Sequence, residues 1–306
     1  MLYRLYNQVL ETEFDLSLLG IKQYSCSDQS LNPNIRITRV KTDSFSTSYK
    51  NNQTSVSRTY GFYYRENIAF YEFISGKEIK VSPLTADFGA DFVRILLNYP
   101  MACLLYQKGY YLLHASAVIF HGKVFIFPGR SLSGKSTIAA YLVKNGGKLI
   151  TEDTAAIHIT NGEAYISPSY PLIKLSDDAN AYIGLSNLSG ITFHHDKNAR
   201  KGHFFDSAFC VDKPLKVDFC IFPEWGYEKP SFTKPTFGKF LGKLLETSLA
   251  IYPLDKSKEK VLLSLNAKFL RSVDYYIYKR EKVFSTLDFL KKDLEFVQRQ
   301  KNGSNY

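Results

Sequence analysis

Cysteine is scarce in this 306-residue sequence, and long apolar runs are absent. No two cysteines form a C-x-x-C pair, so free thiols in a reducing cytosol are expected at Cys26, Cys103, Cys210 and Cys220. No window reaches the roughly 18 consecutive apolar residues that indicate a transmembrane helix. Met1–Tyr6 does not read as a signal peptide, because Glu11 and Glu13 follow it closely. We therefore expect a cytoplasmic protein without a membrane partner.

Signals of nucleic-acid binding are also absent. The sequence has no arginine-rich arm, no zinc-finger spacing and no aromatic ribonucleoprotein motif. The formal net charge is nevertheless +10, which is equally compatible with a lysine-rich surface around a site for an anionic ligand. We expect no nucleic-acid partner.

The clearest positive signal is the nonapeptide Gly129–Thr137, which fits the phosphate-binding pattern G-x-x-x-x-G-K-[ST]. A short apolar strand, Lys123–Phe127, runs into it, and a helix, Thr137–Val143, leaves it and ends at Asn145–Gly147. Backbone N–H groups and a helix N-terminus in this order bind phosphate. The sequence therefore predicts a P-loop for a nucleotide, with a glycine loop that binds none as the alternative.

The P-loop assigns two side chains to ATP and Mg²⁺. Lys135 is expected to reach the β- and γ-phosphates, and the Ser136 hydroxyl to ligate Mg²⁺. The residues expected to contact the nucleotide are Gly129, Ser131, Ser133, Gly134, Lys135, Ser136 and Thr137.

Two adjacent carboxylates follow soon after the loop. Lys148–Thr151 is a short apolar strand, and it ends in Glu152 and Asp153. Ligands of α/β sheets bind outside the carboxyl ends of strands, where such a pair can divide a base and a metal ligand between its members. We assign Glu152 as the base and Asp153, with Ser136, as the metal ligands. The alternative that both carboxylates bind the metal stays open.

The rest of the chain suggests two units and a tail. Residues 1–86 contain alternating strands and a meander, and we interpret them as an N-terminal antiparallel β-rich module. Residues 87–297 are assigned to a nucleotide-binding catalytic domain, which opens with a helix that Pro100 breaks or kinks. Residues 298–306 are assigned to a polar tail.

Three segments of the second unit carry more specific expectations. Asn161–Gly162 predicts a tight hairpin. The polar and basic segment Gly190–Gly202 is expected to be a substrate loop that is disordered without substrate. Leu215–Phe222 is expected to be one core strand.

Taken together, these motifs resemble the HPr kinase/phosphorylase catalytic domain. They are more similar to the small HPr-kinase-like proteins of peptide natural-product clusters, such as lasso-peptide tailoring kinases. The resemblance is carried by Leu113–Val118, Gly129–Thr137, Gly147–Asp153 and Pro168–Leu175. It implies an α/β fold akin to phosphoenolpyruvate carboxykinase, with a mixed sheet and flanking helices, and ATP-dependent phosphorylation of a serine hydroxyl.

The resemblance adds two site residues and shows three departures. His114 has the spacing of the family's active-site histidine, and Lys174 would meet the transferred phosphate; a core histidine and a surface lysine are the alternatives. The family usually has Gly at Leu132, which is tolerable if φ stays negative there. It usually has Asp at Glu152. Its signature segment for phosphorylase activity is not recognisable, so kinase activity alone is expected.

We therefore predict an ATP- and Mg²⁺-dependent kinase that acts on a serine of a peptide or small protein, for example a ribosomal peptide precursor. The alternatives are a small-molecule kinase of the same fold and a nucleotide-binding regulatory protein with little transfer activity. The acceptor's identity and a homo-oligomeric state stay open.

Overall fold

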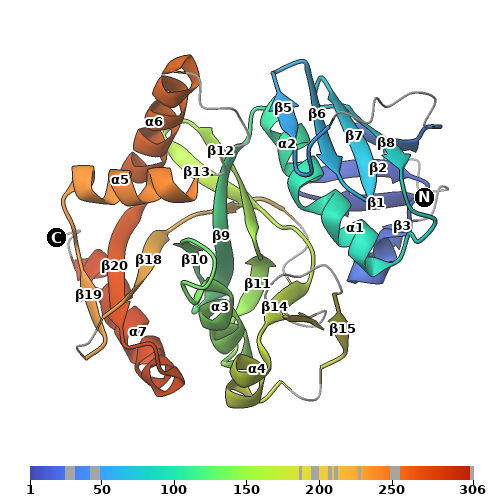
Figure 1. Ribbon diagram of the computed structural model, residues 1–306. Coiled ribbons are helices and arrows are strands. Elements are labelled where there is room, and N and C mark those ends of the chain that lie inside the picture. Colours follow the sequence, from blue (N-terminus) through green and yellow to red (C-terminus); the bar gives the residue numbers. More distant parts are fainter. Residues whose placement is uncertain are drawn as a thin grey trace.

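A computed structural model describes residues 1–24, 32–41, 49–185, 188–193, 200–205, 209, 213–226, 229–248 and 256–303 of the chain. It is a mixed α/β structure with two large sheets, and Figure 1 shows one on each side of the molecule. The first half contains β1 (Leu2–Leu5), β2 (Gln8–Thr12), η1 (Leu16–Leu19), β3 (Gln23–Tyr24), β4 (Ile35–Arg39), β5 (Thr54–Val56), β6 (Tyr60–Arg65), β7 (Ala69–Ile74), β8 (Glu78–Pro83), α1 (Ala90–Leu97) and α2 (Tyr99–Gln107).

The second half supplies the other large sheet and its helices. Its elements are β9 (Tyr111–Phe120), β10 (Lys123–Pro128), α3 (Lys135–Lys144), β11 (Lys148–Thr151), β12 (Thr154–Thr160), β13 (Glu163–Ser167), β14 (Leu172–Leu175), α4 (Asp177–Ile183), β15 (Gly190–Thr192), β16 (Lys201–Phe204), β17 (Leu215–Lys216), β18 (Phe219–Trp225), β19 (Ser231–Thr233), α5 (Phe237–Thr247), α6 (Lys256–Arg271), β20 (Asp274–Arg280), η3 (Phe284–Thr286) and α7 (Leu287–Gly303).

The N-terminal sheet has eight strands in the order β3-β1-β2-β4-β8-β7-β6-β5. The predicted meander is present as β6, β7 and β8, which pair antiparallel. The expectation of a purely antiparallel module is wrong, because β4 runs parallel to both β2 and β8. Alternation of apolar and polar residues identifies a strand but not the direction of its neighbours, so the sequence did not reveal this arrangement.

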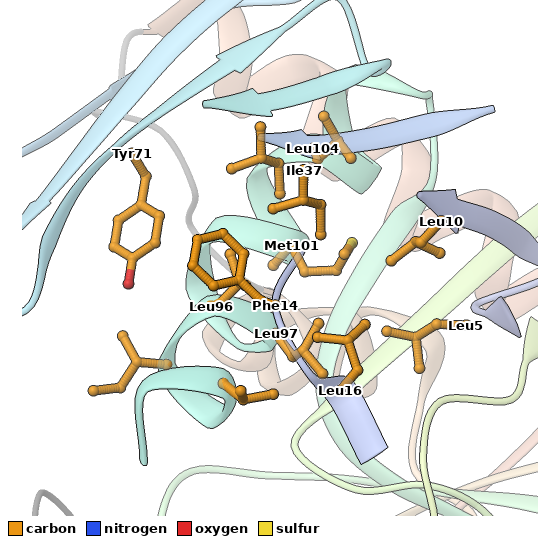
Figure 2. Close-up of a cluster of buried hydrophobic side chains, with 14 of the residues drawn as sticks. Leu5, Leu10, Phe14, Leu16, Ile37, Tyr71, Leu96, Leu97, Met101 and Leu104 are labelled. Carbon is orange, nitrogen blue, oxygen red and sulfur yellow. The ribbon is translucent and has the colours of Figure 1, made fainter. Parts of the chain in front are cut away.

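Helices α1 and α2 cover this sheet and close its core. Figure 2 shows apolar side chains of both helices meeting those of the strands and of η1: Leu5, Leu10, Phe14, Leu16, Ile37, Tyr71, Leu96, Leu97, Met101 and Leu104. The expected helix break lies at Asn98, and Pro100 occupies the first turn of α2, where no intrahelical bond needs its missing N–H. The domain boundary at residue 87 stays a prediction, although these two helices pack on the N-terminal sheet.

The second large sheet has nine strands in the order β17-β13-β12-β9-β10-β18-β20-β19, and β11 pairs with β9 beside this path. Its two faces carry different helices, because alternate side chains of each strand point to opposite sides. Phe125 and Phe127 of β10 pack in one cluster with α3, α4 and α7, whereas Val124 and Ile126 pack in another with α5 and α6. The helix that begins at the P-loop, α3, therefore lies on one face of the sheet with α4 and α7, and α5 and α6 lie on the other.

The predicted single strand over Leu215–Phe222 is wrong, because the chain changes partners within it. β17 pairs with β13 at one end of the sheet, whereas β18 lies between β10 and β20. Asp218 stands between the two short strands, and its carboxylate accepts a hydrogen bond from the Val124 N–H at 3.0 Å. At the C-terminus, α7 continues to Gly303 through most of the segment assigned to a tail.

The Gly190–Gly202 segment is ordered at both described ends, which contradicts the expected disorder there. β15 and the start of β16 pair with each other, and β16 also pairs with β14. Phe193 is buried, with the Arg94 guanidinium 4.9 Å from its ring centroid. Residues 194–199 lie outside the described part of the chain.

Two smaller expectations concern the cysteines and the membrane. Cys103 and Cys220 are free and buried, and the other two cysteines lie outside the described residues. Within the described ranges, no helix combines the length and the apolar character that crossing a membrane requires.

Candidate active site

The P-loop connects β10 to α3 and has the backbone of a phosphate cradle. Gly134, at the N-cap of α3, has φ +86°, which a side chain rarely tolerates. A Cβ at Gly129 would lie 2.4 Å from the Ser133 Oγ, so a side chain there would force Ser133 to move. The Lys135 side chain is buried, and its Nζ donates to the Arg130 carbonyl at 2.9 Å. Of the loop residues predicted from the motif, Ser131, Gly134, Lys135, Ser136 and Thr137 line one cavity.

Leu132, at the top of the loop, differs from the expected conformation. Its φ is +65°, not negative, and its side chain is 66% exposed. A leucine in the left-handed region crowds its own backbone, and glycine does not. The loop thus keeps the backbone shape that suits glycine although the residue is leucine.

The first carboxylate of the pair faces the P-loop. Glu152 is 3% exposed, and its Oε1 accepts a hydrogen bond from the Ser136 Oγ at 2.7 Å. The sequence predicts that Ser136 and Asp153 bind the metal and that Glu152 is the base, with both carboxylates at the metal as the alternative. In the structure Ser136 contacts Glu152 instead, because Asp153 has a left-handed backbone, φ +69°, which turns its side chain out of the strand alternation assumed for it.

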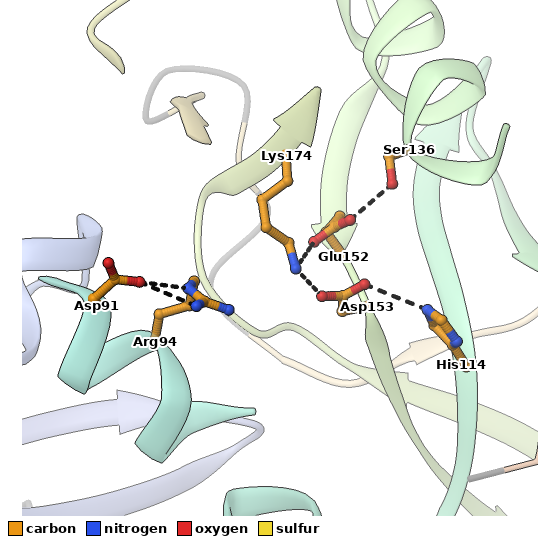
Figure 3. A network of polar contacts seen from close by, with 7 residues as sticks. All are labelled: Asp91, Arg94, His114, Ser136, Glu152, Asp153 and Lys174. Atoms are coloured by element: carbon orange, nitrogen blue, oxygen red, sulfur yellow. Dashed lines mark hydrogen bonds and ion pairs between the residues drawn. The ribbon is translucent and has the colours of Figure 1, made fainter. Parts of the chain in front are cut away.

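The second carboxylate lies between two cationic or basic side chains. The Lys174 ammonium contacts Asp153 directly and lies 3.8 Å from the Glu152 Oε2. His114 of β9 places its Nε2 3.4 Å from the Asp153 Oδ1, on the side away from Lys174 (Figure 3). Lys174 is thus a buried residue of the cluster and not a surface lysine. The role of His114 stays a prediction, because a histidine that only makes hydrogen bonds would have the same contact.

Burial and neighbouring charge separate the pKa values of these groups. Burial raises the pKa of Glu152, and the charge of Asp153 adds to the effect. Burial acts to raise the pKa of Asp153 as well. The contacts with Lys174 and His114 outweigh burial and hold the pKa of Asp153 well below the usual range. Burial lowers the pKa of Lys135 to about 8. Asp153 is therefore the carboxylate that stays ionised most readily.

Two residues of this region were not assigned to the site from the sequence. Arg200 lines a cavity of about 110 Å³ together with His114, Lys135 and Lys174, and its charge acts on both lysines. Its place in a basic segment was the only available signal. Tyr6 comes from the N-terminal sheet, and the charges of Asp153 and Glu152 raise its pKa in addition to burial. Tyr6 lies 146 residues before Glu152 in the sequence, and no local pattern marks it as a site residue. Only the folding of distant segments against each other brings it near the carboxylates.

The donor set fits Mg²⁺ held jointly with phosphate. Mg²⁺ prefers oxygen ligands and is usually bound through one or two protein groups plus substrate phosphates, and the Ser136 hydroxyl with the Glu152 carboxylate supplies such groups. Among the described residues, no three histidine, cysteine or acidic side chains form a metal-binding cluster. The Ser133 Oγ is buried without a partner among the same residues, which leaves a donor for a phosphate oxygen.

Comparisons with known proteins reveal a likeness of structure but not of sequence. No protein-family model and no curated protein sequence matches the chain. Among solved structures, the chain is similar to the Hpr(Ser) kinase/phosphatase from Coxiella burnetii, with 12% sequence identity and a TM-score of 0.31. The similar region covers 62% of this chain and 98% of that one.

Proposed function

We propose that this chain is an ATP- and Mg²⁺-dependent kinase that transfers the γ-phosphate to the hydroxyl of a serine in a peptide or small protein. One observation carries the proposal. Glu152 hydrogen-bonds to the P-loop Ser136, while the adjacent Asp153 is held between His114 and Lys174. The pair thus joins a phosphate-binding loop to an ionised carboxylate, which are the two parts that phosphoryl transfer to a hydroxyl needs.

The first part holds the nucleotide. The backbone N–H groups at the start of α3 and the Lys135 ammonium bind the β- and γ-phosphates. Ser136 and Glu152 supply the protein ligands of Mg²⁺, which when bound neutralises charge that develops on the phosphate oxygens. Arg200 and Lys174 add positive charge at the γ-phosphate end of the cavity.

The second part accepts the proton. The acceptor oxygen forms a bond to the γ-phosphorus as the bond to the β–γ bridging oxygen breaks, and the hydroxyl proton passes to Asp153. His114 orients the Asp153 carboxylate, and Lys174 keeps it ionised. A positioned base of this kind contributes about 10²–10⁴-fold to the rate.

The proposal is tested by two amide substitutions. Asp153→Asn suits the left-handed backbone, so it should leave Mg·ATP affinity within about threefold and lower kcat by at least about 100-fold. Glu152→Gln should instead weaken nucleotide binding in Mg²⁺ and leave metal-free binding unchanged. Calorimetry and transfer of radiolabelled phosphate to a library of seryl peptides measure the two effects.

The matched control is Glu163→Gln. It alters a carboxylate at the β12–β13 hairpin that pairs with Lys216 of β17. It should change neither quantity. If Asp153→Asn abolishes metal-dependent binding while Glu152→Gln affects only kcat, the roles of the pair are the reverse. If no variant and no wild-type preparation transfers phosphate although ATP binds, the chain is a nucleotide-binding regulator.

A small-molecule acceptor is the second candidate, and a cavity favours it. An open pocket of about 350 Å³, within the range of small-molecule sites, lies between residues 4–7 and 20–22 on one side and residues 168–171 and Phe209 on the other. Tyr6 and Tyr170 line it, and the same two side chains are within the electrostatic reach of both carboxylates. Incubation with radiolabelled ATP and a size-fractionated cell extract distinguishes the candidates, since label in fractions below peptide size supports the small molecule.

A further inference from the structure

The only tryptophan of the chain lies at the edge of the sheet where the P-loop opens. Trp225 ends β18, and its partner in register is Arg280 at the end of β20. Both strands run parallel to β10, so their carboxyl ends meet at the edge from which the P-loop leaves β10. Ligands of α/β sheets bind beyond this edge.

Trp225 and Arg280 also lie on the P-loop's face of the sheet. Side chains two residues apart share a face, and Phe219, Ile221 and Tyr278 pack in the same cluster as α3. Direct geometry agrees. A Cβ at Gly134 would lie 3.0 Å from the Trp225 Cη2 and 3.0 Å from the Arg280 Nη2. The indole and the guanidinium therefore border the loop at its second glycine.

Arg280 fixes the indole from one side. It is 2% exposed, its Nη1 donates to the Val283 carbonyl at 3.2 Å and to the Thr286 Oγ1 at 3.0 Å, and its guanidinium carbon lies 4.5 Å from the indole centroid. The Arg280 Nε has no partner among the described residues. Trp225 nevertheless stays 38% exposed, which is unusual for the largest apolar side chain. The result is a rigid aromatic surface supported by a buried cation.

The direction in which the triphosphate lies determines which part of the nucleotide contacts the Trp225 indole. The carboxylates follow β11, which pairs with β9 on one side of β10, whereas β18 lies on the other side. A triphosphate that lies along this edge with its γ end at Asp153 has its nucleoside end on the β18 side of the loop. We propose that Trp225, backed by Arg280, is the platform on which the purine base of the nucleotide stacks. This inference rests on the proposed function, and it adds the base-binding part of the site.

The proposal predicts a selective loss of affinity. Stacking of a base on an aromatic side chain contributes about 1–3 kcal/mol, so Trp225→Leu should weaken Mg·ATP binding by about tenfold or more. Binding of Mg·tripolyphosphate, which has no base, should change by less than twofold. Trp225→Phe keeps a ring and should lose less than Trp225→Leu. The matched control is Tyr60→Leu, an exposed aromatic residue of the N-terminal sheet, which should alter neither ligand.

A second experiment uses the unmodified protein, in case Trp225→Leu does not fold. Photolysis with 8-azido-ATP should label the peptide that contains Trp225 or the one that contains Arg280, and excess ATP should prevent it. Labelling confined to other peptides, or an equal loss of ATP and tripolyphosphate affinity in Trp225→Leu, overturns the base platform and leaves the proposed kinase intact. If wild-type protein binds neither ligand, both the platform and the proposed function are wrong.

Discussion

Lys135 is the residue whose ionisation reports on filling of the P-loop. Burial lowers its pKa to about 8, against 10.5 for an ordinary lysine. At pH 8 the free protein is thus half protonated there, and the negative triphosphate raises the pKa again. Binding of Mg·ATP at pH 8 should therefore take up about half a proton. Calorimetry in buffers of different ionisation enthalpy measures this number.

The titration of Lys135 also makes the free energy of unfolding depend on pH, and the direction of that dependence is defined. Between about pH 8 and 10.5 the unfolded chain holds more protons at Lys135 than the folded one, so this residue makes the free energy of unfolding rise with pH in that window. Lys135→Met removes both effects while preserving the length of the side chain. Proton uptake of equal size in Lys135→Met would assign the titration to another group.

Leu132 carries a conformational cost that one substitution removes. A left-handed backbone costs a leucine about 1–2 kcal/mol, and the greater freedom of glycine in the unfolded chain returns part of that. Leu132→Gly should therefore raise the free energy of unfolding by about 0.5 kcal/mol, as measured by urea denaturation. Leu18→Gly is the control, because Leu18 is 39% exposed but lies in the helical turn η1, where glycine should destabilise. A loss at both positions would show that Leu132 is not strained.

At the scale of single elements, the N-cap of α4 can be tested by substitution. The Ser176 side chain accepts a hydrogen bond from the Ala179 N–H, and it follows directly on β14, which carries Lys174. Ser176→Ala should lower the free energy of unfolding by about 1 kcal/mol, and Ser176→Gly by only a few tenths. Chemical denaturation of both variants measures the difference. Equal losses would mean that the serine hydroxyl does not cap the helix.

Elements with local signals were predictable, and elements defined by distant partners were not. The P-loop strand and helix and the hairpin at Asn161–Gly162 follow from residues that are close together in the sequence. The parallel position of β4 and the split between β17 and β18 depend on which strand lies alongside. Propensity carries no such information.

The same distinction applies to the site. The sequence predicts both carboxylates, His114 and Lys174 as site residues because each belongs to a recognisable segment, and these four side chains lie together in the structure. It did not identify which carboxylate faces Ser136, since that depends on the backbone of Asp153, nor did it identify Trp225, which reaches the loop through strand pairing.

At the scale of the whole molecule, the N-terminal sheet is bonded to the half of the chain that contains the P-loop. The Tyr6 N–H donates to the Pro168 carbonyl at 2.9 Å, and the Gln8 Nε2 donates to the Tyr110 hydroxyl at 2.9 Å. Residues 87–306 alone would leave α1 and α2 without the strands that bury their apolar side chains. This fragment should show no cooperative thermal transition, whereas the full chain should show one. A cooperative melt of the fragment would show that the boundary at residue 87 separates two independent domains.

The left-handed backbone at position 153 also decides the order of the two acids. Aspartate, asparagine and glycine adopt this conformation more readily than other residues, and aspartate alone among them carries a carboxylate. Position 152 has no such restriction, and a glutamate or an aspartate suits its backbone equally. The dipeptide is therefore not interchangeable with its reverse: Glu-Asp and Asp-Asp both fit the backbone at the two positions, while Asp-Glu would give the same charge in a backbone that its second residue resists.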